Sequence, residues 1–166
     1  MAPLFFDADR DGRPDLLITS GSIEHPNGDP AYRDRIHLGS GEKGEFSQAY
    51  FLPGEPMSSS VAAAADFDQD GDLDLFIGGR IVPGRWPTSP GSRLYLNESE
   101  PGTLRFKLAS EEQILRITIE HKQLLEEATN ELQEKEQMIE ALDATLTATE
   151  EKFKGFGVSA CATCDG

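Results

Sequence analysis

Cysteine is absent from the first 160 residues of this 166-residue chain, and the only two are Cys161 and Cys164. A disulfide framework is therefore excluded as the support of the rest of the chain. Long apolar stretches are also missing. No run of about 18 apolar residues exists, so we expect no membrane insertion. The first residues have neither a basic start nor a long apolar core, and we expect no signal peptide in this chain.

Basic residues are scarce as well. The chain has 15 Lys and Arg against 30 Asp and Glu, which gives a formal net charge of -15. Binding to nucleic acid or to an anionic membrane surface is therefore disfavoured on electrostatic grounds. An acidic composition usually means only a well-solvated surface. Here, however, nine acidic residues fall in two short segments, where bound cations would offset their mutual repulsion.

These two segments, residues 7–15 and 66–74, share one pattern and are called the first and second Asp loops. Aspartate occupies positions 1, 3, 5 and 9 of each loop, and glycine at position 6 permits a sharp turn. Oxygen ligands at this spacing suit Ca²⁺, which takes six to eight oxygens in flexible geometry. We therefore expect two Ca²⁺ sites. The predicted ligands are Asp7, Asp9, Asp11, Arg13 (backbone carbonyl), Asp15, Asp66, Asp68, Asp70, Asp72 (backbone carbonyl) and Asp74.

Two other interpretations of the Asp loops are less favoured. An EF-hand requires flanking helices and a bidentate Glu at loop position 12. That position holds Ile18 in the first loop and Ile77 in the second, and the flanks predict strands. Paired aspartates can also perform acid–base catalysis, but this spacing favours a cation. The loops are therefore interpreted as β-hairpin turns that hold a cation.

The Asp loops recur at an offset of 59 residues, and other segments recur with them. Short apolar runs follow both loops, and further pairs of runs precede Gly- or Asn-containing turns, as is typical of strands. Residues 61–65 could be helical by themselves. Because they lead directly into the second loop, we predict a strand there. The sequence thus predicts two β repeats, at about residues 1–53 and 54–108.

The second repeat carries a family resemblance, in the string AADFDQDGDLDLFIGGR at residues 64–80 and RLYLN at residues 93–97. Both repeats, residues 1–108, resemble FG-GAP/VCBS repeats, the blades of integrin-α-like β-propellers, and the second is the closer match. The resemblance implies a mainly β fold with two propeller-type blades and one Ca²⁺ in each loop. It also implies a non-enzymatic role in adhesion or recognition, at an extracellular or cell-surface location, with an unknown protein or glycan ligand. Propellers typically close with four to eight blades, so we expect a fragment of a larger propeller protein, or completion by another chain.

Glycine and proline are absent from residues 109–154, where Glu, Gln, Leu, Ala and Lys predict one long acidic helix. Ser110 and Gln113 form a plausible capping box at its start. Apolar residues seven apart suggest a coiled coil and a homo-oligomer. They are Leu125, Leu132, Ile139, Leu146 and Phe153. A single solvated amphipathic helix is the alternative, because the segment has 12 acidic and 5 basic residues, which opposes self-pairing.

The tail, residues 155–166, contains the string GVSACATCDG. It resembles the redox segment of bacterial thioredoxin reductases. The resemblance implies that Cys161 and Cys164 form a redox pair with Asp165 as acid–base partner, so a thiol–disulfide redox protein is an alternative function. Nothing in the chain resembles the FAD or NADPH domains, and reductase activity is not expected. Unrelated resemblances in successive segments suggest a composite chain.

Overall fold

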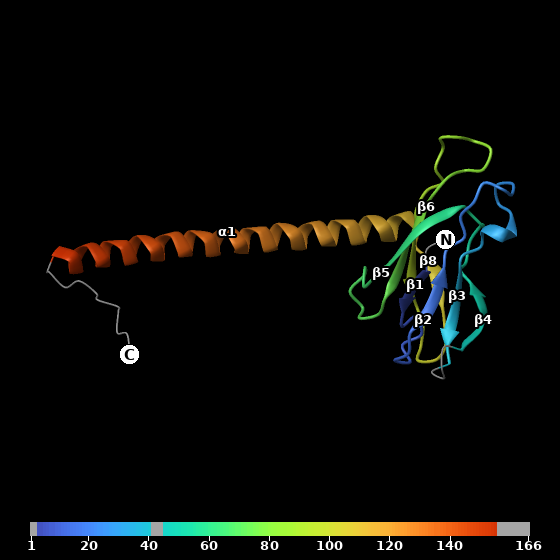
Figure 1. Cartoon of the computed structure of the whole chain (residues 1–166), viewed down its shortest axis with the longest axis horizontal. Coiled ribbons are helices and arrows are strands. Elements are labelled where there is room, and N and C mark those ends of the chain that lie inside the picture. Colours follow the sequence, from blue (N-terminus) through green and yellow to red (C-terminus); the bar gives the residue numbers. More distant parts are fainter. Residues whose placement is uncertain (1–2, 41–44, 156–166) are drawn as a thin grey trace, which may run out of the picture. The chain divides into compact units, whose positions relative to one another are not determined.

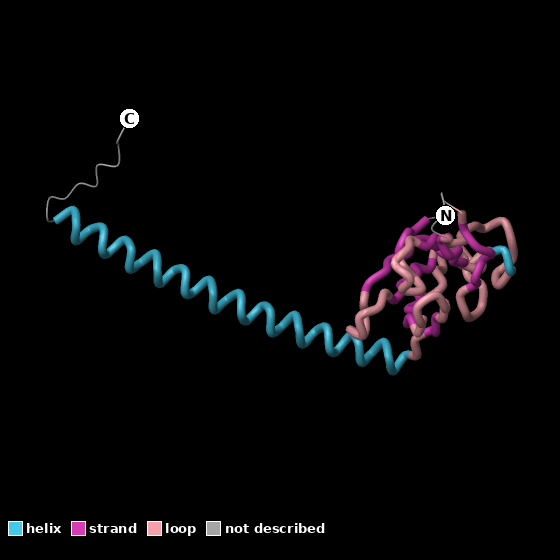
Figure 2. Tube along the Cα trace, turned by 90° about the horizontal axis from the view of Figure 1, so that it is seen from below, coloured by secondary structure: helices cyan, strands magenta, loops and turns pink. Residues whose placement is uncertain are grey.

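The computed structural model describes residues 3–40 and 45–155 (Figure 1). The chain divides into two compact units, Met1–Ile117 and Thr118–Gly166. The first unit contains all the described strands, which Figure 2 shows in magenta. The second unit continues the helix that begins in the first.

The first unit is built from two four-stranded antiparallel sheets. In each sheet the strands lie side by side in the order in which they occur in the sequence, as in the blades of a propeller. This confirms the predicted mainly β fold with two propeller-type blades. The first sheet comprises β1 (Pro3–Phe6), β2 (Asp15–Ile18), β3 (Arg35–Gly39) and β4 (Phe46–Phe51). The second comprises β5 (Ser59–Ala65), β6 (Asp74–Gly79), β7 (Arg93–Asn97) and β8 (Phe106–Leu108).

The alanine-rich run before the second Asp loop lies in β5, as predicted from the repeat. Alanine favours helices in isolated peptides, but here the alanines pair with residues of the neighbouring strand β6. Ala63 pairs with Phe76, and Ala65 pairs with Asp74 at the end of the hairpin. Pairing with β6 therefore overrides the local preference.

One hydrophobic core lies between the two sheets. The first sheet contributes Phe6, Leu17 and Ile36, and the second contributes Leu75 and Tyr95 among others. Leu17 pairs with Ile36 across β2 and β3, and Leu75 pairs with Tyr95 across β6 and β7. Because side chains alternate between the faces of a strand, these pairs all point to the same side of their sheets. The two blades consequently share one core.

A buried carboxylate fastens the two blades at the end of the strands opposite the Asp loops. Asp34, 5% exposed, accepts a hydrogen bond from the Ser20 amide (2.7 Å) and another from the Ser59 hydroxyl (2.7 Å). Ser20 follows β2 and Ser59 begins β5, so this acid joins both sheets. Burial raises the pKa of Asp34, which its hydrogen bonds partly oppose. Ser58 adds a second link, because its hydroxyl donates to the Ser22 carbonyl (2.8 Å) and accepts from the Ser22 amide (3.1 Å).

A single short 3₁₀ helix, η1 (Pro30–Tyr32), interrupts the loop between β2 and β3 among the described residues. Asp29 caps it, accepting a hydrogen bond from the Ala31 amide (2.9 Å). The Tyr32 hydroxyl donates to the His25 carbonyl (2.9 Å), which ties the two ends of this loop segment together.

The helix α1 (Glu111–Gly155) starts at the predicted capping box. The Gln113 amide donates to the Ser110 hydroxyl (3.2 Å), and the Ser110 amide donates to the Gln113 side chain (3.0 Å). Ile117 is 4% exposed and packs in a small cluster with Leu94, Leu96 and Ala109. Since Leu94 and Leu96 alternate with Tyr95 along β7, the first turns of α1 cover the face of the second sheet that points away from the shared core.

Beyond Ile117 the apolar residues of α1 are exposed, with Leu125 at 69% and Phe153 at 63%. The predicted long acidic helix is present, since α1 spans 45 residues. Within the described ranges, no helix combines the length and the apolar character needed to cross a bilayer.

Candidate metal centres

The two Asp loops have left-handed residues at the same two positions. The residues at position 4, Arg10 and Gln69, have φ angles of 60° and 62°. The glycines at position 6, Gly12 and Gly71, have φ angles of 83° and 95°. These left-handed values are readily adopted by glycine and cost free energy in other residues. Two such residues in each loop give the turn that brings alternate aspartates together.

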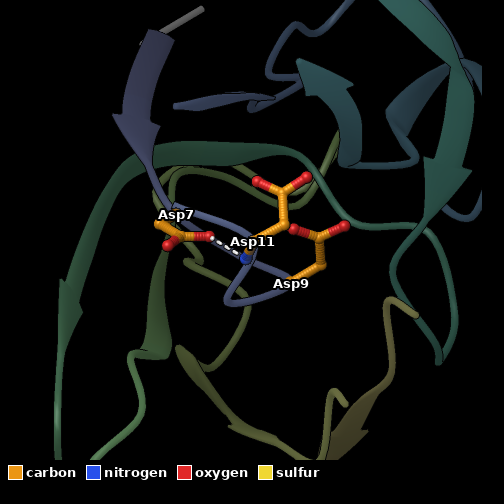
Figure 3. A group of neighbouring side chains, drawn as sticks. All are labelled: Asp7, Asp9 and Asp11. Atoms are coloured by element: carbon orange, nitrogen blue, oxygen red, sulfur yellow. Dashed lines mark hydrogen bonds between the residues drawn. The ribbon is translucent and has the colours of Figure 1, made fainter. Parts of the chain in front are cut away.

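The aspartate at position 1 organises each turn through the backbone. Asp7 accepts hydrogen bonds from the amides of Asp11 (3.1 Å) and Gly12 (2.9 Å). Figure 3 shows the first of these as a dashed line. Asp66 holds the corresponding two amides of the second loop at 3.1 Å each. The position 1 carboxylate thus folds the turn as well as contributing charge to it.

The aspartate at position 9 ties each loop to the third strand of its sheet. Asp15 is fully buried and accepts hydrogen bonds from the amides of Ala8 (2.7 Å) and Gly39 (2.8 Å). Asp74 is also fully buried, and it accepts from the Asn97 amide at the end of β7 (2.8 Å). Burial raises the pKa of both carboxyl groups, and these hydrogen bonds act in the opposite direction.

The aspartate at position 3 has an unsatisfied oxygen in both loops. The Oδ1 atoms of Asp9 and Asp68 are buried and have no hydrogen-bond partner. Burial raises the pKa of both groups, and the neighbouring carboxylates raise it further. A buried acceptor without a partner costs free energy, and a charged one costs more. An oxygen-binding cation would remove that cost, so the residues present fit a bound metal ion.

The structure groups the carboxylates slightly differently in the two loops. In the first loop, drawn in Figure 3, one side-chain oxygen from each of Asp7, Asp9 and Asp11 lies within 4.8 Å of the others. In the second loop the corresponding group is Asp66, Asp68 and Asp74. The first group uses positions 1, 3 and 5, and the second uses positions 1, 3 and 9. Both groups could hold a metal ion.

Position 7 differs between the loops, and its side chains make contacts that sequence reasoning missed. The Arg13 guanidinium pairs with Asp11. Asp72, 6% exposed, lies 3.6 Å from Arg10 Nη1 of the first loop, which is an ion pair between the two loops. Burial and the adjacent Asp70 carboxyl raise the pKa of Asp72 to about 7, which Arg10 opposes. The sequence pattern gave no signal for this pairing across repeats.

The predicted redox group, Cys161, Cys164 and Asp165, lies outside the described residues.

Comparison with known proteins bears on the Asp loops. A family model described as an FG-GAP-like repeat matches residues 7–77. The matched stretch begins at position 1 of the first Asp loop and ends in β6, so it includes both loops. No curated protein and no solved structure matches the chain.

Proposed function

Residues 7–77 match the model of an FG-GAP-like repeat, and from that match we propose that this chain is a non-enzymatic, calcium-binding β-repeat module that serves adhesion or recognition outside the cell. The observation that carries the calcium proposal is the buried, unpartnered Oδ1 atom of Asp9 and of Asp68, at the same position of two similar loops. Each lies in a group of carboxylates that converge within 4.8 Å. This arrangement is costly without a cation.

Calcium suits these loops better than other common cations. All side chains in the two groups offer oxygen, which excludes a preference for soft metals. Mg²⁺ requires near-ideal octahedral geometry and keeps several waters, whereas Ca²⁺ accepts more ligands in less regular positions. The residues that would hold Ca²⁺ are Asp7, Asp9, Asp11, Asp15 and the Arg13 carbonyl in the first loop, and Asp66, Asp68, Asp70, Asp74 and the Asp72 carbonyl in the second. Bound there, Ca²⁺ would neutralise the carboxylates and fix each hairpin.

Calorimetry on the full chain tests this proposal. Ca²⁺ that binds only the folded state raises the melting temperature of the β unit, and the stabilisation reaches about 2.7 kcal/mol per site at a hundredfold excess over Kd. Calorimetry is preferable to far-ultraviolet circular dichroism, because α1 spans 45 residues and dominates that signal. No calcium-dependent shift between a chelator and millimolar Ca²⁺ would overturn the proposal.

Substitutions at position 3 of each Asp loop distinguish a cation ligand from a purely structural acid. Asp9→Asn and Asp68→Asn keep the side-chain volume but remove the buried charge. We expect both variants to be more stable than the wild type in chelator and to gain less from Ca²⁺. Asp143→Asn, which removes one charge on an exposed part of α1, is the matched control and should respond to Ca²⁺ like the wild type. A purely structural acid would instead lose stability on substitution in both conditions.

The recognition part of the proposal is supported by exposed apolar side chains in two corresponding loops. Trp86 is 84% exposed between β6 and β7, and Ile23 is 68% exposed between β2 and β3. Tryptophan is prominent in binding hot spots. Because Trp86 is the only tryptophan in the chain, its fluorescence reports directly on this loop. Screening extracellular proteins and glycans by Trp86 fluorescence tests this role, and titration calorimetry of any ligand so found against Trp86→Ala, which lacks the fluorophore, shows whether the side chain contributes to affinity.

Self-association through α1 is a second candidate function. It is favoured by apolar residues at seven-residue spacing that are all exposed: Leu125, Leu132, Ile139, Leu146 and Phe153. Sedimentation of the full chain would reveal a dimer or higher oligomer. Ile139→Glu places a charge within this apolar row and should shift the equilibrium to monomer, whereas Gln137→Glu adds the same charge outside it. A wild-type monomer at high concentration would exclude this function.

A further inference from the structure

The two Asp loops are physically connected through one side chain at the end of β7. Asn97 is 3% exposed, and its Nδ2 donates to the Ala8 carbonyl in the first loop (3.1 Å). The same nitrogen donates to the Leu73 carbonyl in the second loop (3.0 Å). Ala8 precedes Asp9, and Leu73 precedes Asp74. One amide group therefore holds the backbone of both loops next to a predicted ligand.

The backbone of Asn97 completes this connection. Its amide is held by Asp74, the position 9 carboxylate of the second loop (2.8 Å). The turn that follows also touches the first loop, because the Gly102 amide donates to the Asp9 carbonyl (3.0 Å). A change in the position of Asp74 would thus reach Asp9 through two short paths. All of these groups lie in the first compact unit.

The first repeat has no counterpart to this side chain. By strand register, Gly39 in β3 corresponds to Asn97 in β7, because His37 and Tyr95 pair with equivalent residues of the second strands. The Gly39 amide donates to Asp15 as the Asn97 amide donates to Asp74, so the local role of the backbone is the same. A Cβ at Gly39 would clash with the Pro14 carbonyl oxygen. The Asn97 side chain is therefore an addition of the second repeat, and it points at the first.

We propose that Asn97 is a positioning residue that couples the two cation sites, so that Ca²⁺ bound in either Asp loop raises the affinity of the other. This inference rests on the proposed calcium binding. A cation that fixes Asp74 also fixes the Asn97 amide, and the side chain of Asn97 then holds Ala8 and the adjacent Asp9 in place. The first cation therefore orders part of the other loop, and the second cation binds at a smaller cost in conformational entropy. This is positive coupling between the two sites.

Electrostatic repulsion between the two cations acts in the opposite direction. Neutralising one loop lowers the negative potential at the other and so weakens its hold on a second cation. This effect is partly screened at physiological salt, where the Debye length is about 8 Å. It does not depend on Asn97. Removing the Asn97 side chain should therefore leave independent sites or weakly negative coupling.

Nuclear magnetic resonance can measure each loop separately, because the Gly12 and Gly71 amides report on the first and second loops. The calcium Kd at Gly12 is measured in the wild type and in Asp68→Asn, which disables the second loop. We expect the Kd to be weaker by about fivefold or more in Asp68→Asn. Reciprocity requires the Kd at Gly71 to weaken by the same factor in Asp9→Asn, a measurement that needs no change at Asn97.

The Asn97→Ala background then identifies the path. In that background, disabling one loop should change the calcium Kd of the other by a factor of about one or below. The backbone amide of residue 97 remains, but the hydrogen bond to the Ala8 carbonyl is lost. Ser58→Ala is the matched control: it also removes two hydrogen bonds between segments, but away from the Asp loops, and should preserve the coupling. Equal factors in the wild-type and Asn97→Ala backgrounds, or no coupling in the wild type, would overturn the inference while leaving calcium binding intact. If neither glycine responds to Ca²⁺ in the wild type, the proposed function itself fails.

Discussion

Asp34 offers a sharp test of how the two blades are held together, because two substitutions at this position should have different effects. Asp34→Ala removes the acceptor for the Ser20 amide and the Ser59 hydroxyl. The Ser59 hydroxyl already lies 3.2 Å from the Met57 carbonyl and can donate there instead. Among the described residues Asp34 is the acceptor of the Ser20 amide, and a buried donor left without a partner costs about 1–3 kcal/mol.

Asp34→Ala also removes a buried carboxylate, and this gain offsets part of the cost of the two lost hydrogen bonds. We therefore expect the substitution to reduce the free energy of unfolding by about 2 kcal/mol. For a unit of this size, that corresponds to a fall in melting temperature of roughly 10 °C. Asp34→Asn should cost less than about 1 kcal/mol. Its carbonyl can accept from the Ser20 amide, and its NH₂ group can donate to the Ser59 oxygen while the Ser59 hydroxyl turns to Met57.

The pH dependence separates charge from hydrogen bonding. Because burial raises the pKa of Asp34, the folded state holds the proton more tightly than the unfolded chain. The stabilisation from that proton is fully present below the unfolded pKa, about 3.9, and is lost as the pH rises through the folded pKa. The stability of the wild type relative to Asp34→Asn should therefore fall as the pH rises from about 4 towards neutral. Neither variant can show this titration.

Guanidinium denaturation at a fixed calcium concentration, repeated across this pH range, measures all three proteins. Two results would refute the reasoning. One is a difference between wild type and Asp34→Asn that stays constant with pH. The other is an Asn variant as unstable as the Ala variant, which would mean that the carboxylate charge, and not the pair of hydrogen bonds, holds the blades.

Two further predictions concern packing. Gly39→Ala should destabilise the β unit by about 2–4 kcal/mol, because the added Cβ meets the Pro14 carbonyl. Gly91→Ala is the control: its Cβ enters open space, and stability should change by less than about 0.5 kcal/mol. Similar melting temperatures for the two variants would contradict the strand register. Ile117→Ala should cost about 2–4 kcal/mol in calorimetry through loss of the cover over the second sheet. Ile119→Ala, at a position 48% exposed, is its control, and equal effects would show that α1 does not pack there.

Much of the fold was accessible from sequence because it depends on local patterns. The repeat offset, the apolar runs and the glycines of the Asp loops predicted the strands and hairpins that the structure contains. The repeat also resolved residues 61–65, where alanine alone favours a helix. Ser110 and Gln113 predicted the start of α1, because a capping box acts within four residues.

The parts that sequence did not predict depend on contacts between segments that are far apart in the chain. The Arg10–Asp72 ion pair and the Asn97 link join residues that are far apart in the chain. A single asparagine at the end of a strand has no distinctive pattern, and an arginine in an acidic loop gives no sign of which acid it will pair with. Ile117 likewise belongs to a helical periodicity that does not specify which surface it will cover.

Gly39 and Asn97 also bear on how such a chain can be altered by duplication. A protein made from two copies of the first repeat would carry glycine where the cross-repeat link is needed. A protein made from two copies of the second would carry an asparagine in its first copy, where no preceding Asp loop supplies a carbonyl like that of Ala8. The two repeats have the same strand order but are not interchangeable. Exchanging their positions would lose the hydrogen bond between Asn97 and Ala8, which requires one residue from each repeat. Their order is thus encoded at a single residue that lies outside both ion-binding motifs.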